Sequence, residues 1–482
     1  MKRTLLVFLL INLMLFACAP ASTPAPTPAP SATPLPTATT APTNTAVPTA
    51  TPTPIPSIQV GDLSVPDPRV TNPELFDLTK PEAPIPQFVN AMRMAGIEVN
   101  GEQILDALNN PKSYKRMNDG KIQILFTTEK DGNKYSMGFV YDPGIKQWRE
   151  INLNDLNIRI GLELTGKDDP SSNLYNVLSE NSSILFTGGK MLYRTSGDAA
   201  NIQGLHLLEI GNKQLELYMH CAFYPNDTYP NLTDNSATEE FIDDRLKAFL
   251  YVAKEAKEKG YPAPTINLLN EGNSFSGVDT NTPIGRFYNI EQFSGVYVRA
   301  YRMAQEMGLV VGKDVRFSFS DAYVFGNIKE DIVVQTLNRT MDKISNALNI
   351  PRGQIQLDFA GQLRIDYGAT QYRQRRAPTP EEFMRAVYKI KEVIGPNNRL
   401  YVTEIRVANA RNPEDIVNTL APLIMAGISS GQIDAWMFEA PFRTREKIDP
   451  SYNSRNIHLF EEGLAPGIFY YWLLSFLCPD LQ

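Results

Sequence analysis

The sequence predicts an α/β fold, a (β/α)8 barrel over residues 151–482, which follows a small α+β module and a disordered linker rich in proline and threonine. Short apolar runs alternate with helical stretches across this region, which is the pattern of parallel strands joined by helices. The eight runs centre on Ile160, Leu185, Leu217, Asn267, Phe317, Leu357, Val402 and Ala435. An open doubly wound sheet is the alternative, but such a sheet usually begins with a glycine-rich turn, and the sequence has none here.

The N-terminus has the pattern of a secretory signal. Two basic residues precede an apolar stretch, Leu5 to Phe16, which is too short to span a bilayer. The stretch ends in alanine followed by Cys18, which resembles the lipobox of bacterial lipoproteins. We therefore expect cleavage after residue 17, a lipid on Cys18, and an extracytoplasmic protein anchored to a membrane. A plain signal peptide with a chance cysteine is the alternative.

Composition limits the remaining classes of function. Residues 18–57 are almost wholly proline, threonine, alanine and serine, so they cannot form a core and predict an extended, disordered stalk. The net charge of −7, with both signs interspersed, argues against nucleic acid as a partner. Three cysteines and three widely spaced histidines indicate neither a disulfide framework nor a zinc motif. We expect a monomer without metal or organic cofactor.

Residues 58–150 predict the small α+β module. Two helices are expected, at 86–97 and at 101–109. Asp131-Gly132 predicts a tight hairpin, with strands at 121–128, 134–141 and around Trp148.

Three helices of the barrel region carry clear end signals. Apolar residues recur at helical spacing from Phe241 to Lys259, and Gly260 then predicts a C-terminal stop. Thr379-Pro-Glu-Glu382 predicts a capping box with proline at the first helical position. Asn412-Pro-Glu414 predicts another helix start of the same kind.

Two apolar strands each lead to one carboxylate. Thr265 to Asn270 is followed by Glu271, and the run Leu400 to Val407 contains Glu404. Charge inside an apolar run is costly, so we expect each carboxylate where its strand ends and a cavity begins. By strand count Glu271 ends the fourth strand and Glu404 the seventh, which face each other in a closed barrel. This is how barrel glycosidases hold an acid and a nucleophile.

These segments resemble glycoside hydrolase family 10, the xylanase-type barrels, over most of residues 155–482. Asn270-Glu271 is similar to the family's acid/base segment, and Thr403-Glu404-Ile405 is similar to its nucleophile segment. The resemblance implies that Glu271 is the acid/base and Glu404 the nucleophile of a retaining enzyme. It also implies a sugar site lined by Asn270, His220, Gln362, Tyr323 and Trp436, and we expect Arg364, which stands where the family has a histidine, to line the same site.

Two segments depart from the family pattern. The second strand of the family carries Glu-Asn-x-Met-Lys-Trp, whereas this chain has Thr187-Gly-Gly-Lys-Met-Leu-Tyr193. The sixth strand of the family has Gln-x-His, whereas this chain has Gln362-Leu-Arg364. An arginine near Glu404 would favour the ionised form of that carboxylate.

The resemblance implies a hydrolase of xylan or a related β-1,4-glycan. A surface-displayed carbohydrate-binding protein that has lost efficient hydrolysis is the first alternative, motivated by the changed second strand. A barrel glycosidase acting on a different polysaccharide is the second.

Overall fold

We describe a computed structural model of the chain, which divides by its internal contacts into residues 1–54 and 55–482. The structure describes 57–60, 63–66, 88–89, 92–93, 98–101, 114–116, 122–130, 133–142, 147–150, 153, 158–164, 177–178, 181–187, 215–224, 235–271, 290–322, 324–325, 330–366, 377–408, 413–439, 459 and 467–477. The predicted signal sequence, the lipid site at Cys18 and almost all of the stalk lie outside these residues. No helix in the described ranges is long and apolar enough to cross a membrane.

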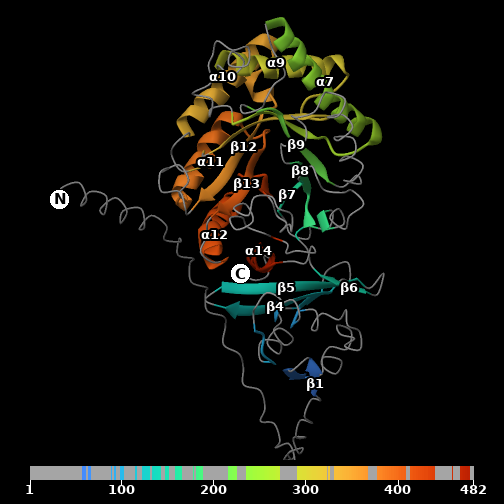
Figure 1. Cartoon of the computed structure of the whole chain (residues 1–482), viewed down its shortest axis with the longest axis vertical. Helices are drawn as coiled ribbons and strands as arrows, with labels where there is room; N and C mark the ends of the chain where they lie inside the picture. The colour runs from blue at the N-terminus through green and yellow to red at the C-terminus, as the bar shows by residue number, and fades with distance from the viewer. Residues whose placement is uncertain are drawn as a thin grey trace, which may run out of the picture. The chain divides into compact units, whose positions relative to one another are not determined.

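Parallel strands close into a barrel, and helices surround it (Figure 1). The eight strands pair in the cyclic order β10-β11-β12-β13-β14-β7-β8-β9. Their bounds are β7 (Ile160–Leu164), β8 (Ile184–Thr187), β9 (Glu216–Phe223), β10 (Thr265–Asn270), β11 (Arg316–Ala322), β12 (Asp358–Asp366), β13 (Leu400–Ala408) and β14 (Ala435–Phe438). The predicted (β/α)8 fold is confirmed, and Leu357 is the only predicted strand centre outside its strand, by one residue.

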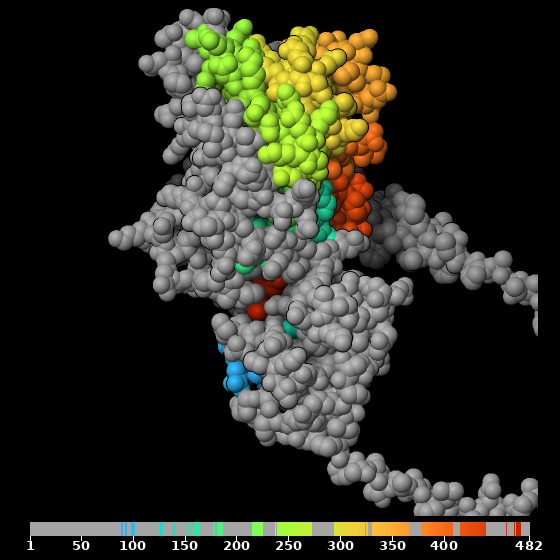
Figure 2. Space-filling model, turned by 90° about the vertical axis from the view of Figure 1, so that its right-hand side faces the viewer, coloured from blue at the N-terminus to red at the C-terminus, as the bar shows by residue number. Residues whose placement is uncertain are grey.

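The helices lie outside the barrel, and α7, α9 and α10 form part of the molecular surface (Figure 2). Their bounds are α7 (Asn235–Lys259), α9 (Ile290–Glu306), α10 (Glu330–Leu348), α11 (Pro380–Ile394), α12 (Pro413–Ser430) and α14 (Ile468–Leu477), with a 3-10 turn at Arg352–Gln354. The helix predicted from Phe241 begins earlier, at Asn235, and ends as expected before Gly260, whose φ is 68°.

The capping box of α11 is confirmed. The Glu382 backbone N–H donates to Thr379 Oγ1 at 3.2 Å, and the Thr379 N–H donates to Glu382 Oε2 at 3.0 Å. Two backbone donors that the helix itself cannot pair are thereby satisfied. The start of α12 at Pro413 also agrees with the predicted signal.

Two antiparallel sheets are formed by the described residues between Ser57 and Glu150. Strands β1 (Ser57–Val60) and β2 (Leu63–Pro66) form a ribbon. A four-stranded sheet has the order β3 (Tyr114–Arg116), β4 (Ile122–Lys130), β5 (Asn133–Asp142) and β6 (Gln147–Glu150). The predicted hairpin is confirmed, since Lys130 pairs with Asn133 across the turn. The described parts of both predicted helices are helical, and the domain boundary at residue 150 stays a prediction.

The barrel interior is filled in layers, as in other closed eight-stranded barrels. A compact inner cluster consists of Ile184, Phe186, Tyr218, Ala360, Tyr401, Ala435 and Met437. On β14 the alternate residues Trp436 and Phe438 belong instead to the larger core, which includes residues of the surrounding helices. Side chains alternate along a strand, so one residue of register decides which core each side chain joins.

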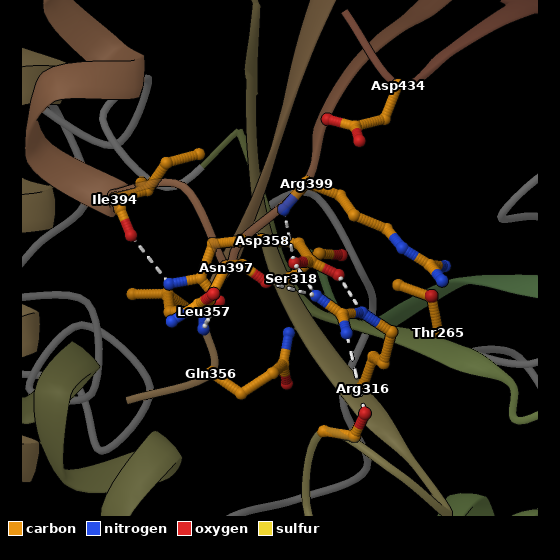
Figure 3. Close-up of polar contacts among 12 residues, drawn as sticks. Thr265, Arg316, Ser318, Gln356, Leu357, Asp358, Ile394, Asn397, Arg399 and Asp434 are labelled. Atoms are coloured by element: carbon orange, nitrogen blue, oxygen red, sulfur yellow. Dashed lines mark hydrogen bonds and ion pairs between the residues drawn. The ribbon is translucent and has the colours of Figure 1, made fainter. Parts of the chain in front are cut away.

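Charged side chains form the layer at the amino ends of the strands (Figure 3). The guanidinium of Arg316 donates to Asp358 from Nε at 2.8 Å and from Nη2 at 2.6 Å. The backbone N–H of Arg399 donates to Asp358 Oδ1 at 2.8 Å, and Arg399 Nη1 pairs with Glu216 at 2.8 Å. Burial raises the pKa of Asp358, and the Arg316 hydrogen bond opposes that rise. In barrels of this kind, residues at the amino ends of the strands contribute to stability, whereas catalytic residues lie at the carboxyl ends.

Candidate active site

The two candidate catalytic glutamates lie toward the opposite, carboxyl ends of the strands. Glu271 follows the last residue of β10, as expected. Glu404 does not end its strand, because β13 continues to Ala408. A register shift between Val402 and Ile405, relative to β14, interrupts the regular ladder at Glu404. A bulge of this kind re-aims a side chain, so a charged residue lies within an apolar strand without ending it.

Both glutamates have a left-handed backbone. The φ angle is 51° at Glu271 and 47° at Glu404, and Asn349 is the only other described non-glycine residue with a positive φ. Such a conformation costs about 1–3 kcal/mol for a residue with a Cβ, and it concentrates at functional sites. The two glutamates are also buried, with 8% and 4% of their surface exposed.

Arg364 on β12 joins the two carboxylates. Its Nη1 donates to Glu271 Oε1 at 2.9 Å, and its Nη2 donates to Glu404 Oε2. A register shift between Gln362 and Arg364, relative to β13, lies directly before it. The predicted proximity of an arginine to Glu404 is therefore present in the structure, and the same guanidinium also reaches Glu271.

The second oxygen of Glu404 lies in a network of polar side chains. Glu404 Oε1 accepts a hydrogen bond from Gln362 Nε2 at 2.8 Å and lies 3.2 Å from His220 Nε2. Gln362 Nε2 also donates to Asn270 Oδ1 at 3.0 Å. The structure thus brings Asn270, His220, Gln362 and Arg364 together with both glutamates.

Asn267 on β10 holds the other ring nitrogen of His220. The Asn267 side-chain amide lies between two backbone carbonyls, of Leu269 and Ser318, and two side chains, His220 and Ser320. Carbonyl oxygens only accept, so the amide nitrogen faces them, at 2.9 and 3.3 Å. The amide oxygen then accepts from His220 Nδ1 at 2.8 Å. His220 therefore carries a proton on Nδ1.

Sequence reasoning missed Asn267 and Ser320. Ser320 Oγ lies 2.7 Å from the side-chain oxygens of both Asn267 and Asn270, and its one proton serves one of them. The sequence did contain a signal for Asn267, because a fully buried amide in the apolar run Thr265 to Asn270 requires hydrogen-bond partners. The sequence does not show which partners, because they lie on other strands.

Trp436 lies away from this site. The residue is 2% exposed, and its ring packs against Phe383 of α11 with ring centroids 6.2 Å apart. Gly427 of α12 also approaches it closely. The expected role of Trp436 as a sugar-binding surface is not supported, because its position on β14 turns the ring toward the helices. Tyr323 and the second-strand segment after Thr187 lie outside the described residues.

Within the described ranges, no group of three or more histidine, cysteine, aspartate or glutamate residues could hold a metal ion. Cys221, next to His220, is a buried free thiol. The site as described is a pair of carboxylates, one guanidinium, one imidazole and neutral amides. Such a set is suited to proton transfer and nucleophilic attack.

No family model and no curated protein sequence matches the chain. Among solved structures, xylanase 10B from Thermotoga petrophila RKU-1, in complex with xylobiose, matches with a TM-score of 0.52 at 15% identity, covering 69% of this chain and 99% of that one. Native xylanase 10B from Thermotoga maritima matches with a TM-score of 0.48 at 16% identity, covering 68% and 97%. At such identities the first likeness shows the fold: this chain has a barrel like that of a family 10 xylanase.

Proposed function

We propose that the protein is a glycoside hydrolase that cleaves a β-1,4-linked plant-type polysaccharide, with xylan as the first candidate. The observation that carries this proposal is the pair of buried carboxylates on β10 and β13, both on left-handed backbone and both within reach of one guanidinium. The resemblance of the Asn270-Glu271 and Thr403-Glu404 segments to family 10 supports it. The barrel of the Thermotoga petrophila xylanase, which was solved with xylobiose, supports the choice of substrate.

The proposed reaction is a double displacement. Glu271 donates a proton to the leaving glycosidic oxygen while Glu404 bonds to the anomeric carbon, which releases the first sugar product. Glu271, now a carboxylate, removes a proton from water, and the water oxygen displaces Glu404. Both glutamates end as they began, and one water molecule is consumed for each bond cleaved.

The test is reducing-sugar release by the full chain on a panel of β-glycans. Glu271→Gln should lower the rate by about 10²–10⁴, the usual contribution of a general acid. Glu404→Gln should abolish turnover, because an amide does not form the glycosyl intermediate. The exposed Glu306→Gln on α9 is the matched control and should leave the rate unchanged. Full activity in either site variant would refute the assigned roles.

A second candidate function is carbohydrate binding without efficient hydrolysis. It is favoured by the position of Arg364, which contacts both carboxylates and leaves neither of them free of an ion pair. Xylohexaose that binds in calorimetry and stays intact over long incubation would support this candidate. Product formation that depends on both glutamates would exclude it.

We also propose that the protein is a membrane-anchored extracytoplasmic lipoprotein, with its lipid on Cys18. The lipobox-like segment and the proline- and threonine-rich residues 18–57 support this location. Cys18→Ala should move the protein from the membrane fraction to the soluble fraction. If Cys18→Ala left the amount of protein in the membrane fraction unchanged, the proposed lipid anchor would be contradicted.

A further inference from the structure

Ser320 of β11 contacts both asparagines of β10 and the glutamate that follows them. It is fully buried and lies in register with Asn270, the residue before Glu271. Its carbonyl oxygen accepts a hydrogen bond from the backbone N–H of Glu271 at 2.9 Å. Its hydroxyl oxygen lies 2.7 Å from the side-chain oxygens of Asn267 and Asn270. One residue of β11 thus contacts three residues of the segment that carries the candidate acid/base.

The hydroxyl group of Ser320 closes a ring of polar side chains. The ring has six members from the five consecutive strands β9 to β13, and each member has 6% or less of its surface exposed. In order, the members are Glu404, Gln362, Asn270, Ser320, Asn267 and His220, which returns to Glu404. Each step joins two polar atoms 2.7–3.2 Å apart. In a buried network of this kind, the loss of one member leaves the neighbours of that member without a partner.

The ring fixes how the amide group of Asn270 is turned. Its oxygen faces two donors, Ser320 Oγ at 2.7 Å and Gln362 Nε2 at 3.0 Å. The amide nitrogen is therefore turned out of the ring, and it has no hydrogen-bond partner among the described residues. An amide nitrogen carries two protons that it can donate. Asn270 thus presents a donor to a ligand rather than to the protein.

We propose that Ser320 is a positioning residue, whose hydroxyl group holds the Asn270 amide so that its nitrogen can donate to a sugar hydroxyl beside Glu271. The hydroxyl has one proton and lies between two amide oxygens, so Asn267 and Asn270 share it. Without it, Gln362 is the one remaining donor to the Asn270 oxygen among the described residues, and the amide can turn about that single hydrogen bond. Ser320 acts on the substrate through Asn270 and not by direct contact.

Ser318 provides a matched control on the same strand. It lies two residues before Ser320 and is equally buried. Its hydroxyl oxygen is 3.0 Å from the hydroxyl oxygen of Tyr218. Ser318→Ala and Ser320→Ala each remove one buried hydroxyl group from β11. The two variants differ in which side chain loses its partner, Tyr218 or the asparagines.

The first test is NMR of the ligand-free full chain labelled with ¹⁵N-asparagine. The side-chain signals of Asn270 are assigned by their loss in Asn270→Ala. The measurement is the order parameter of the Asn270 amide, which falls when the group becomes mobile. We expect it to fall in Ser320→Ala and to stay at the wild-type value in Ser318→Ala. An unchanged order parameter in Ser320→Ala, or an equal fall in both variants, would overturn the proposal.

The second test is kinetic and uses the glycan from which the full chain releases reducing sugar. Ser320→Ala should lower kcat/KM about tenfold, the effect of one lost hydrogen bond, and Ser318→Ala should change it less than twofold. Ser320→Cys fills the same space with a weak donor, so its loss should resemble that of Ser320→Ala. Wild-type kcat/KM in Ser320→Ala would overturn the proposal. Wild-type kcat/KM in Ser320→Cys would also overturn it, because the residue would then act by filling space.

The catalytic meaning of this inference rests on the proposed function, but the NMR test needs no turnover. In a chain that hydrolyses no glycan, the order parameter of Asn270 still tests the role of Ser320. In an active enzyme, an Asn270 amide that stays ordered in Ser320→Ala would refute the role of Ser320 and leave the proposed function in place. The two proposals therefore fail separately.

Discussion

Gln362 shows how a single side chain can serve the site at little benefit to stability. Its Nε2 donates to Glu404 and Asn270, while its Oε1 is buried and has no hydrogen-bond partner among the described residues. A buried polar atom without a partner costs about 1–3 kcal/mol, which offsets what the two hydrogen bonds contribute. Gln362 is therefore placed for function rather than for folding.

We predict that Gln362→Leu changes the free energy of unfolding by less than about 1 kcal/mol, since it removes both the hydrogen bonds and the unpaired oxygen. Gln362→Glu, nearly the same shape, should be clearly less stable, because it buries a second acidic group against Glu404. Urea unfolding of the two variants tests this. Equal stability of the two would contradict the role assigned to Oε1.

Arg364 makes a second prediction at the residue scale. Arg364→Gln removes the cation that contacts both buried carboxylates. We expect it to lower the free energy of unfolding by about 3–5 kcal/mol, because it leaves buried charges without their partner. The exposed Arg302→Gln on α9, which removes the same charge far from the site, should change that free energy by less than about 0.5 kcal/mol. Equal stability of the two variants in urea unfolding would contradict the role of the guanidinium as the counter-charge of the pair.

The residue types of the site could be predicted from the sequence, but their orientation could not. Glu271 and Glu404 were found because each carboxylate lies in or directly after an apolar strand, whereas His220 and Gln362 were found through the resemblance of their segments to family 10. Trp436 was assigned to the sugar site because it belongs to a similar segment, yet its ring packs on Phe383. A shift of one residue along a strand moves a side chain to the other face of the sheet. Similarity of a short motif does not specify the strand register, so it does not tell which face the side chain is on.

At the scale of elements, the close contact between α12 and β14 can be tested through a glycine. A Cβ at Gly427 would lie 2.6 Å from atoms of both Ile433 and Trp436. We predict that Gly427→Ala destabilises the protein by about 1–3 kcal/mol, because overpacking outweighs the gain in helix propensity. Thermal or urea unfolding provides the measurement.

Gly295 on α9 is the matched control for this prediction. A Cβ there would meet no atom within 4 Å, so only the helix propensity changes. Gly295→Ala should stabilise the protein by up to about 1 kcal/mol. If Gly427→Ala and Gly295→Ala changed the free energy of unfolding in the same direction, the packing described for Gly427 would be contradicted.

Features that depend on a few adjacent residues were predicted correctly from the sequence. Features that depend on the pairing of neighbouring strands were not. The capping box at Thr379 and the hairpin after Lys130 depend on a few adjacent residues, and both are present. The irregular registers on β10, β12 and β13 depend on pairing between strands that are far apart in sequence. They aim Arg364 and Glu404 at each other, so the bridging guanidinium could not be foreseen.

At the scale of the whole molecule, the barrel separates stability from chemistry. The Arg316–Asp358 pair closes one end, with Asp358 fully buried, and the glutamates lie toward the other. We predict that Asp358→Asn lowers the free energy of unfolding by about 3–5 kcal/mol, because it leaves the Arg316 charge buried without its partner. Below the unfolding temperature, activity should change little. Loss of activity in a fully folded variant would contradict this separation.

The exposed pair of Arg352 and Asp342 is the control for the buried one. Its side chains are 38% and 58% exposed, so solvent screens the interaction. Asp342→Asn should cost less than about 1 kcal/mol in urea unfolding. A large loss there would mean that exposure does not explain the difference between the two pairs.

The left-handed backbone at Glu271 and Glu404 has a consequence for protein engineering. Glycine and asparagine fit such a backbone better than glutamate does, and neither brings a buried charge. A redesign that maximises stability would therefore replace Glu271 early, because Arg364 would keep Glu404 as its partner. Selection for a more robust chain and selection for a reactive one act in opposite directions at these positions.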